Sequence, residues 1–320
     1  MLRSLRANEL VNRPGEAWKL IQLAVKQSMR AKSEAPNLPS DTLGFELKPS
    51  QDRKRIQGTV IDNTLVVAIP GSGNIMDWAV NGNYEPTSTR DFGGTAAQFH
   101  QGFLAVAKVM QEELANRITA TVTALRAQTP EPPEHIDLLL TGHSAGGAMA
   151  QLFYSMAMSE SSHLAIATIA HNFRRVHCIV FGAPPITTIP IKPPARDPFQ
   201  SGLFLSIINE GDPVPLLQKE YVEALLRVFV LSAEDLQSHY PNGFRVPDPV
   251  FRASGTCVVL CDSDASNLEE DGWIAVKIEE AKLHGKLFGN VSVHSCEQYL
   301  ERCTSLAGGN GGSRTEELTP

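Results

Sequence analysis

Two kinds of hydrophobic pattern alternate along the chain. Short apolar runs typical of buried strands are separated by longer stretches in which apolar residues recur at helical spacing. The runs lie at 55–61, 64–69, 136–140, 176–181, 203–208 and 255–260, and the helical stretches at 16–32, 96–128, 148–156 and 216–229. Strands that alternate with helices predict an α/β fold with a mainly parallel central sheet and helices on both faces.

The same pattern divides the chain into three parts. Residues 1–50 are expected to hold an N-terminal helix and a loop rich in Pro and Ser over 33–50. We interpret this helix as a cover packed on the domain, with a partner-binding helix as the alternative. Residues 51–305 are expected to form the main domain, and the glycine-rich tail 306–320 is expected to be disordered.

Charge and composition narrow the classes of function. The net charge of −7 gives no reason to expect binding to nucleic acid. No apolar run reaches about 18 residues, so no transmembrane segment is expected. The first residues carry arginines but no apolar core and do not resemble a secretory signal, while Glu9 and Glu16 argue against a mitochondrial presequence. We therefore expect a cytoplasmic protein.

The five cysteines fit this expectation, because an odd number without a secretory signal favours free thiols in a reducing compartment. Cys257 and Cys261 are four positions apart on an expected strand, which places them on one face with Val259. A zinc site would need two further ligands at suitable spacing, so packing is the favoured role. We expect neither a metal ion nor another cofactor.

The first candidate for chemistry is the motif Gly-x-Ser-x-Gly at residues 142–146. It lies between the expected strand 136–140 and the expected helix 148–156, as in a nucleophile elbow. Such a turn exposes the serine hydroxyl, here that of Ser144, and needs glycines because side chains would collide with neighbouring backbone. The alternative is a glycine-rich turn that binds a phosphate or only packs.

A second glycine-rich loop, Pro-Gly-Ser-Gly at 70–73, directly follows the expected strand 64–69. An α/β-hydrolase takes one oxyanion donor from such a loop and the other from the residue after the nucleophile. The candidates are therefore the N–H groups of Ser72 and Ala145, with a plain glycine turn as the alternative for the loop. The apolar residues that follow form either a lid over a pocket or a buried helix: Ile75, Met76, Trp78 and Val80.

An acidic residue follows the strand 203–208, where α/β sheets place functional groups. Asp212 in the loop 209–215 is either a catalytic acid or only a turn former before Pro213. Among the later histidines, His294 is favoured over His239 and His284 because it follows an apolar run that we interpret as a strand.

Together these pieces resemble the class 3 lipases of the α/β-hydrolase fold, in the family's order and over about residues 55–300. The resemblance implies hydrolysis of acylglycerols or related carboxylic esters by a triad of Ser144, Asp212 and His294, with a short lid at 74–82. The stretch between Asp212 and His294 is long for the family and is expected to carry an insertion near 230–250. The matching pieces are residues 70–73 with Asp77 and Trp78, 100–103, 142–147, 181–184, 209–215, and His294 with Tyr299.

The sequence leaves three hypotheses about the function. The leading hypothesis is a serine hydrolase of lipid esters whose partner is a lipid or ester substrate, met at a lipid–water interface. The second is a catalytically silent lipase-like domain that binds a partner or a lipid. The third is an esterase or acyltransferase for small soluble substrates.

Overall fold

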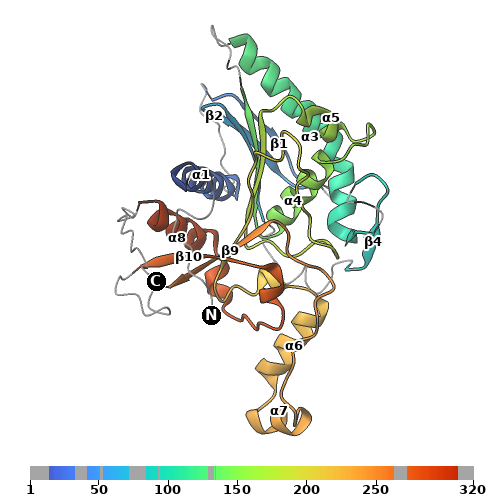
Figure 1. Ribbon diagram of the computed structural model, residues 1–320, viewed down its shortest axis with the longest axis vertical. Helices are drawn as coiled ribbons and strands as arrows, with labels where there is room; N and C mark the ends of the chain where they lie inside the picture. Colours follow the sequence, from blue (N-terminus) through green and yellow to red (C-terminus); the bar gives the residue numbers. More distant parts are fainter. Residues whose placement is uncertain are drawn as a thin grey trace, which may run out of the picture.

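The fold is built on one central sheet of eight strands in the order β1-β2-β3-β6-β7-β8-β9-β10 (Figure 1). The computed structural model describes residues 14–32, 42–50, 53–71, 84–92, 94, 96–128, 133, 135–262 and 272–308. The strands are β1 (Gly44–Leu47), β2 (Ile56–Ile61), β3 (Thr64–Ile69), β6 (Asp137–His143), β7 (Arg175–Phe181), β8 (Phe204–Asn209), β9 (Thr256–Asp262) and β10 (Trp273–Ile278). A separate pair consists of β4 (Pro86–Ser88) and β5 (Gln98–His100).

The middle of the sheet is parallel and its two edges are antiparallel. β3, β6, β7, β8 and β9 pair in parallel, whereas β1, β2 and β3 form an antiparallel meander and β10 runs antiparallel to β9. Central strands covered on both faces must be apolar on both, and all seven residues of β6 are buried. The predicted α/β class with a mainly parallel sheet is thus confirmed.

Helices cover both faces of the sheet, and each layer has its own hydrophobic cluster. One face carries α3 (Gln101–Gln128), α4 (Ala145–Ala157) and α5 (Ala165–Ala170), and the other carries α1 (Pro14–Lys32) and α8 (Cys296–Gly308) (Figure 1). On α1, Trp18, Ile21 and Val25 are buried at helical spacing and share a cluster with Tyr299 of α8. The N-terminal helix is therefore a cover helix, as predicted.

One part of the chain departs from the layered body. Helices α6 (Lys219–Val230) and α7 (Ala233–His239) project from it in Figure 1. Not one residue from 225 to 250 is buried. Leu226, Phe229 and Val230 expose 53%, 68% and 78% of their surface. This projection overlaps in part with the stretch 230–250, where an insertion is expected from the sequence.

Several element boundaries differ from the predictions. Strand β1 lies inside the stretch predicted as a loop, β10 and α7 were not predicted, and α3 begins at Gln101 because residues 98–100 form β5. The expected strand before His294 is instead a 3-10 helix, η5 (Val291–His294), whose N-terminus is capped by Asn290. The alternation Val-Ser-Val-His imitates a strand, but Val291 is 62% exposed and the segment pairs with no strand among the described residues.

The cysteines behave as predicted from their spacing. All five are free and buried. Cys257, Val259 and Cys261 pack in one cluster with Ile208, Val276 and Leu283. Burial raises the pKa of both thiols to about 12, so they remain protonated packing groups. Among the described residues, none of the helices combines the length and the apolar character needed to cross a bilayer.

Candidate active site

The predicted site residues gather because four parallel strands end at the same edge of the sheet. The register pairs Ile69 with Gly142, His143 with Phe181, and Phe181 with Ile207. Residues that directly follow β3, β6, β7 and β8 are therefore neighbours, although long stretches of sequence separate them.

Ser144 occupies the sharp turn between β6 and α4 that the motif predicted. Its φ of 59° and ψ of −132° are rare for a residue with a side chain, and its N–H donates to the Phe181 carbonyl at 2.9 Å. A Cβ on Gly142 would lie 2.4 Å from the Gly146 carbonyl carbon, and one on Gly146 would lie 2.0 Å from the Ile69 oxygen. Both positions therefore require glycine.

The loop after β3 passes beside the serine. A Cβ on Gly71 would lie 3.0 Å from Cβ of Ser144, so the backbone there approaches the elbow closely. Ala145 is the first residue of α4, and an N–H in the first turn has no acceptor within its own helix. The other predicted donor, Ser72, and the predicted lid residues lie outside the described residues: Ile75, Met76, Trp78 and Val80.

Asp212 and His294 meet, although 82 positions separate them. Nδ1 of His294 lies 2.8 Å from Oδ2 of Asp212, and the carboxylate is fully buried. Nε2 of His294 is buried and has no hydrogen-bond partner among the described residues, Ser144 included. The competing histidines contact other groups, since His284 pairs with Glu280 and Nδ1 of His239 lies 2.8 Å from a backbone oxygen of its own helix.

The loops that carry the acid and the base are held to each other by hydrogen bonds to backbone carbonyl groups. The side-chain amide of Asn209 donates to the Val293 carbonyl at 2.7 Å, and the Asn290 N–H donates to the Gly211 carbonyl at 3.0 Å. Oδ1 of Asp212 accepts the Val214 N–H at 2.9 Å, which fixes the carboxylate in its own turn. The motif Asn-x-x-Asp thus joins η5 to the end of β8.

Three residues at this site were not assigned a role from the sequence. The Tyr299 hydroxyl donates to Oδ2 of Asp212 at 2.6 Å, and Nε2 of His143 lies 2.6 Å from the His294 carbonyl oxygen. Gly182, with φ of +54°, leaves room for the pair, since a Cβ there would lie 2.8 Å from Oδ2 of Asp212. Tyr299 and His143 lie within motifs that the sequence singled out, but nothing in the sequence predicted these contacts.

Burial sets the protonation of the surrounding groups. It is the main cause that lowers the pKa of His143 to about 4, with the charge of His294 as the next. Burial also raises the pKa of Tyr299 well above its ordinary value, and the nearby Asp212 adds to this. At neutral pH His143 is therefore a neutral ring, and Tyr299 keeps the proton that it donates to Asp212.

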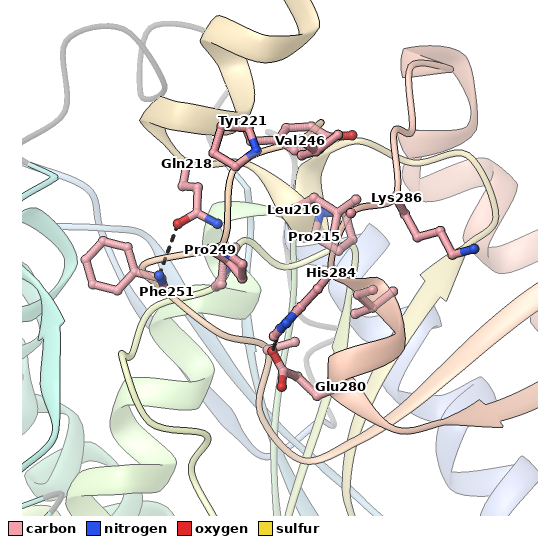
Figure 2. Close-up of a pocket in the computed structure, with 15 residues that line it drawn as sticks. Pro215, Leu216, Gln218, Tyr221, Val246, Pro249, Phe251, Glu280, His284 and Lys286 are labelled. Carbon is pink, nitrogen blue, oxygen red and sulfur yellow. Dashed lines mark hydrogen bonds and ion pairs between the residues drawn. The ribbon is translucent and has the colours of Figure 1, made fainter. Parts of the chain in front are cut away.

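A pocket lies at the root of α6 (Figure 2), where hydrogen bonds and ion pairs anchor the projection. Oε1 of Gln218 accepts the backbone N–H groups of residues 250 and 251 at 2.8 and 3.0 Å. Glu280 accepts from Arg252 at 2.7 Å and lies 2.7 Å from His284. Arg252, Glu280 and His284 thus contact one another at this pocket, so the edge of the sheet beside Ser144 is the better candidate for chemistry.

The doubly covered parallel sheet, with a strained serine turn between β6 and α4 and an acid after β8, defines the class of α/β-hydrolases. Residues 66–221, which carry the elbow and Asp212, match the family of class 3 lipases. The resemblance seen in the sequence is thus confirmed over these residues, and the match identifies the protein as a carboxylic ester hydrolase.

Solved structures with this fold include several fungal lipases. One is a triacylglycerol lipase described as having a serine protease triad, with 15% identity, a TM-score of 0.57 and coverage of 92% of this chain and 96% of that one. A Rhizomucor miehei lipase–propeptide complex has 16% identity, a TM-score of 0.55 and coverage of 92% and 81%. A Penicillium expansum triacylglycerol lipase has 16% identity, a TM-score of 0.51 and coverage of 83% and 84%. No curated protein matches the sequence at a significant level.

Proposed function

We propose that the protein cleaves lipid carboxylic esters through an acyl-enzyme formed on Ser144, with His294 as general base and Asp212 as its partner. The observation that carries the proposal is the buried contact of 2.8 Å between Nδ1 of His294 and Oδ2 of Asp212. This contact fixes the tautomer in which Nδ1 carries the hydrogen, and it leaves the lone pair of Nε2 for the proton of a hydroxyl.

The chemistry then takes two steps. Oγ of Ser144 attacks the ester carbonyl while Nε2 of His294 takes its proton, and the same nitrogen returns that proton to the departing alcohol. Water, deprotonated by His294, next attacks the acyl-enzyme; the bond from Oγ of Ser144 to the acyl carbon then breaks, His294 returns the proton to Oγ, and the carboxylic acid is released. Throughout, the Asp212 carboxylate stabilises the imidazolium without taking up a proton.

The tetrahedral intermediate carries a negatively charged oxygen. Stabilising this charge requires hydrogen-bond donors that are already in position before the reaction. We assign the Ala145 N–H to this role because it begins α4 next to Ser144, and the Ser72 N–H because Gly71 lies against Ser144. Loss of one such donor typically lowers the rate about 100- to 1000-fold.

For the substrate we propose acylglycerols, met at a lipid–water interface. The support is the family match together with structural relatives described as triacylglycerol lipases. An ester chain-length series, assayed below and above the solubility limit, tests this part. A rate that rises when the ester passes from monomer to emulsion supports a lipase, and a rate that saturates below that limit favours an esterase for small substrates.

The nucleophile is tested with a fluorophosphonate probe at neutral pH. The wild-type protein is expected to be labelled at Ser144, and Ser144→Ala is expected to remain unlabelled. Ser155→Ala is the matched control, because Ser155 is a buried serine of the same helix and should leave labelling intact. A folded wild-type protein that takes up no probe and turns over no p-nitrophenyl ester, yet binds lipid, would indicate the catalytically silent domain instead.

A further inference from the structure

The Asp212 carboxylate has one oxygen that serves two donors. Oδ2 lies 2.8 Å from Nδ1 of His294 and accepts the Tyr299 hydroxyl at 2.6 Å. The same hydroxyl accepts the N–H of Asn209 at 3.0 Å, and Tyr299 is fully buried. The Tyr299 hydroxyl therefore donates to the loop after β8 and accepts from the last residue of β8, and both hydrogen bonds connect α8 to this end of the strand.

His294 is held from its other side by the residue that precedes the serine. Nε2 of His143 lies 2.6 Å from the His294 carbonyl oxygen, and the two rings lie 4.5 Å apart at an angle of 33°. Because His143 is neutral at working pH, its Nε2–H donates to this carbonyl and adds no positive charge beside the base. Any shift of His294 is thereby coupled to the elbow that carries Ser144.

We propose that Tyr299 and His143 are positioning residues: Tyr299 orients Asp212 and withdraws charge from it, and His143 fixes His294 relative to Ser144. The inference rests on the proposed function, since it concerns the same acid and base. It assigns to both residues an effect on the rate and, for Tyr299, an effect on the pH at which the base works.

The direction of the pH effect follows from the shared oxygen. A hydroxyl that donates to Oδ2 spreads the negative charge, so removing it leaves more charge beside the imidazole. That charge stabilises the imidazolium form of the base, so we expect the acid limb of the pH–rate profile to lie at a higher pH in the variant. The other titratable or charged groups that face this cluster among the described residues are Glu297, Arg302 and Cys303 on α8, Lys32 on α1 and Tyr221 on α6.

Tyr299→Phe tests the first role, because it removes only one oxygen. We expect kcat to fall roughly 3- to 10-fold, less than for a group that touches the transition state. We also expect the acid limb of the kcat/KM profile to move up by about half a pH unit. The matched control is Tyr154→Phe, since Tyr154 is equally buried and its hydroxyl has no partner among the described residues. This control is expected to change neither quantity.

His143→Phe and His143→Gln test the second role. Phenylalanine keeps a ring but loses the donor, whereas glutamine supplies an amide N–H at similar reach. We expect kcat to fall roughly 10-fold in His143→Phe, with little change in KM, and to recover at least in part in His143→Gln. If the His143 ring only filled space, His143→Phe would keep the higher kcat and His143→Gln would have the lower one.

The outcomes separate this inference from the proposed function. A wild-type protein that is inactive and unlabelled contradicts the proposed function, whatever the variants do. An active wild type whose Tyr299→Phe variant keeps both its rate and its acid limb contradicts the role of Tyr299. Circular dichroism and thermal unfolding of each variant establish that rates are compared between folded proteins.

Discussion

Directly after β7 the chain turns at Gly182 with φ of +54°, a value that favours glycine. An added Cβ would lie 2.8 Å from Oδ2 of Asp212 and 3.0 Å from Nδ1 of His294. We expect Gly182→Ala to push the acid and base apart and to lower kcat/KM about 100-fold or more, because small misplacements of catalytic groups have effects of this size. Steady-state hydrolysis of a short-chain p-nitrophenyl ester measures the loss.

Gly243 provides the matched control. It has φ of +88°, but a Cβ there would have no neighbour within 4 Å. Gly243→Ala should therefore cost about 1–2 kcal/mol in backbone strain and leave hydrolysis unchanged. Equal loss of activity in the two variants would mean that strain in the turn, and not contact with the pair, explains the effect.

At this scale the sequence singled out the residues of the proposed triad, but not the groups that hold them. Ser144 and Asp212 follow strands in recognisable motifs, and the late position of His294 matched the family. Tyr299 contacts Asp212 across 87 positions, a contact that no local spacing encodes. The same holds for Gly182, whose role depends on where η5 folds.

Among the elements, α1 and α6 carry similar aliphatic residues in opposite environments. Ile21 of α1 is fully buried between helix and sheet, whereas Leu226 of α6 is 53% exposed. Ile21→Ala should lower the free energy of unfolding by about 2–5 kcal/mol through lost burial and an unfilled cavity. Leu226→Ala should change it by less than about 0.5 kcal/mol.

Urea unfolding, followed by circular dichroism, measures both variants. The comparison tests whether α1 belongs to the cooperative unit even though the family match covers only residues 66–221. A small effect of Ile21→Ala would contradict this, because a helix that unfolds separately would leave the main transition in place.

The elements that the sequence predicted are those with a buried face. Burial produces a recognisable sequence pattern in these elements. It appears as helical spacing on α1 and as apolar runs in β3, β6, β7 and β8. In α7 no residue is buried, so no periodic pattern marks it. The strand β10 lies at the edge of the sheet with a partly exposed face, so its short run Trp273–Ile278 gives a weaker pattern than the central runs do.

For the whole molecule, acid stability depends on histidines that fold without charge. Burial lowers the pKa of His100, His143 and His177 to about 4 each, below the ordinary imidazole value of about 6.5. Between these pH values the unfolded chain binds protons that the folded one does not. The stabilisation from neutral rings is complete above pH ~6.5 and is lost as the pH falls towards ~4, by about 1.4 kcal/mol per pH unit for each ring.

His177 allows this contribution to be isolated, because it lies outside the candidate active site. Its Nδ1 accepts the Leu203 N–H at 2.9 Å, and the side-chain oxygen of asparagine can accept the same hydrogen. The free energy of unfolding of His177→Asn should therefore fall less steeply between pH 6.5 and 4.5 than that of the wild type. The two slopes should differ by about the contribution of one proton bound on unfolding. His163→Asn, at an exposed position, should keep the wild-type slope. Urea unfolding at several pH values measures these slopes, and parallel curves for His177→Asn and the wild type would mean that His177 is already charged in the folded protein.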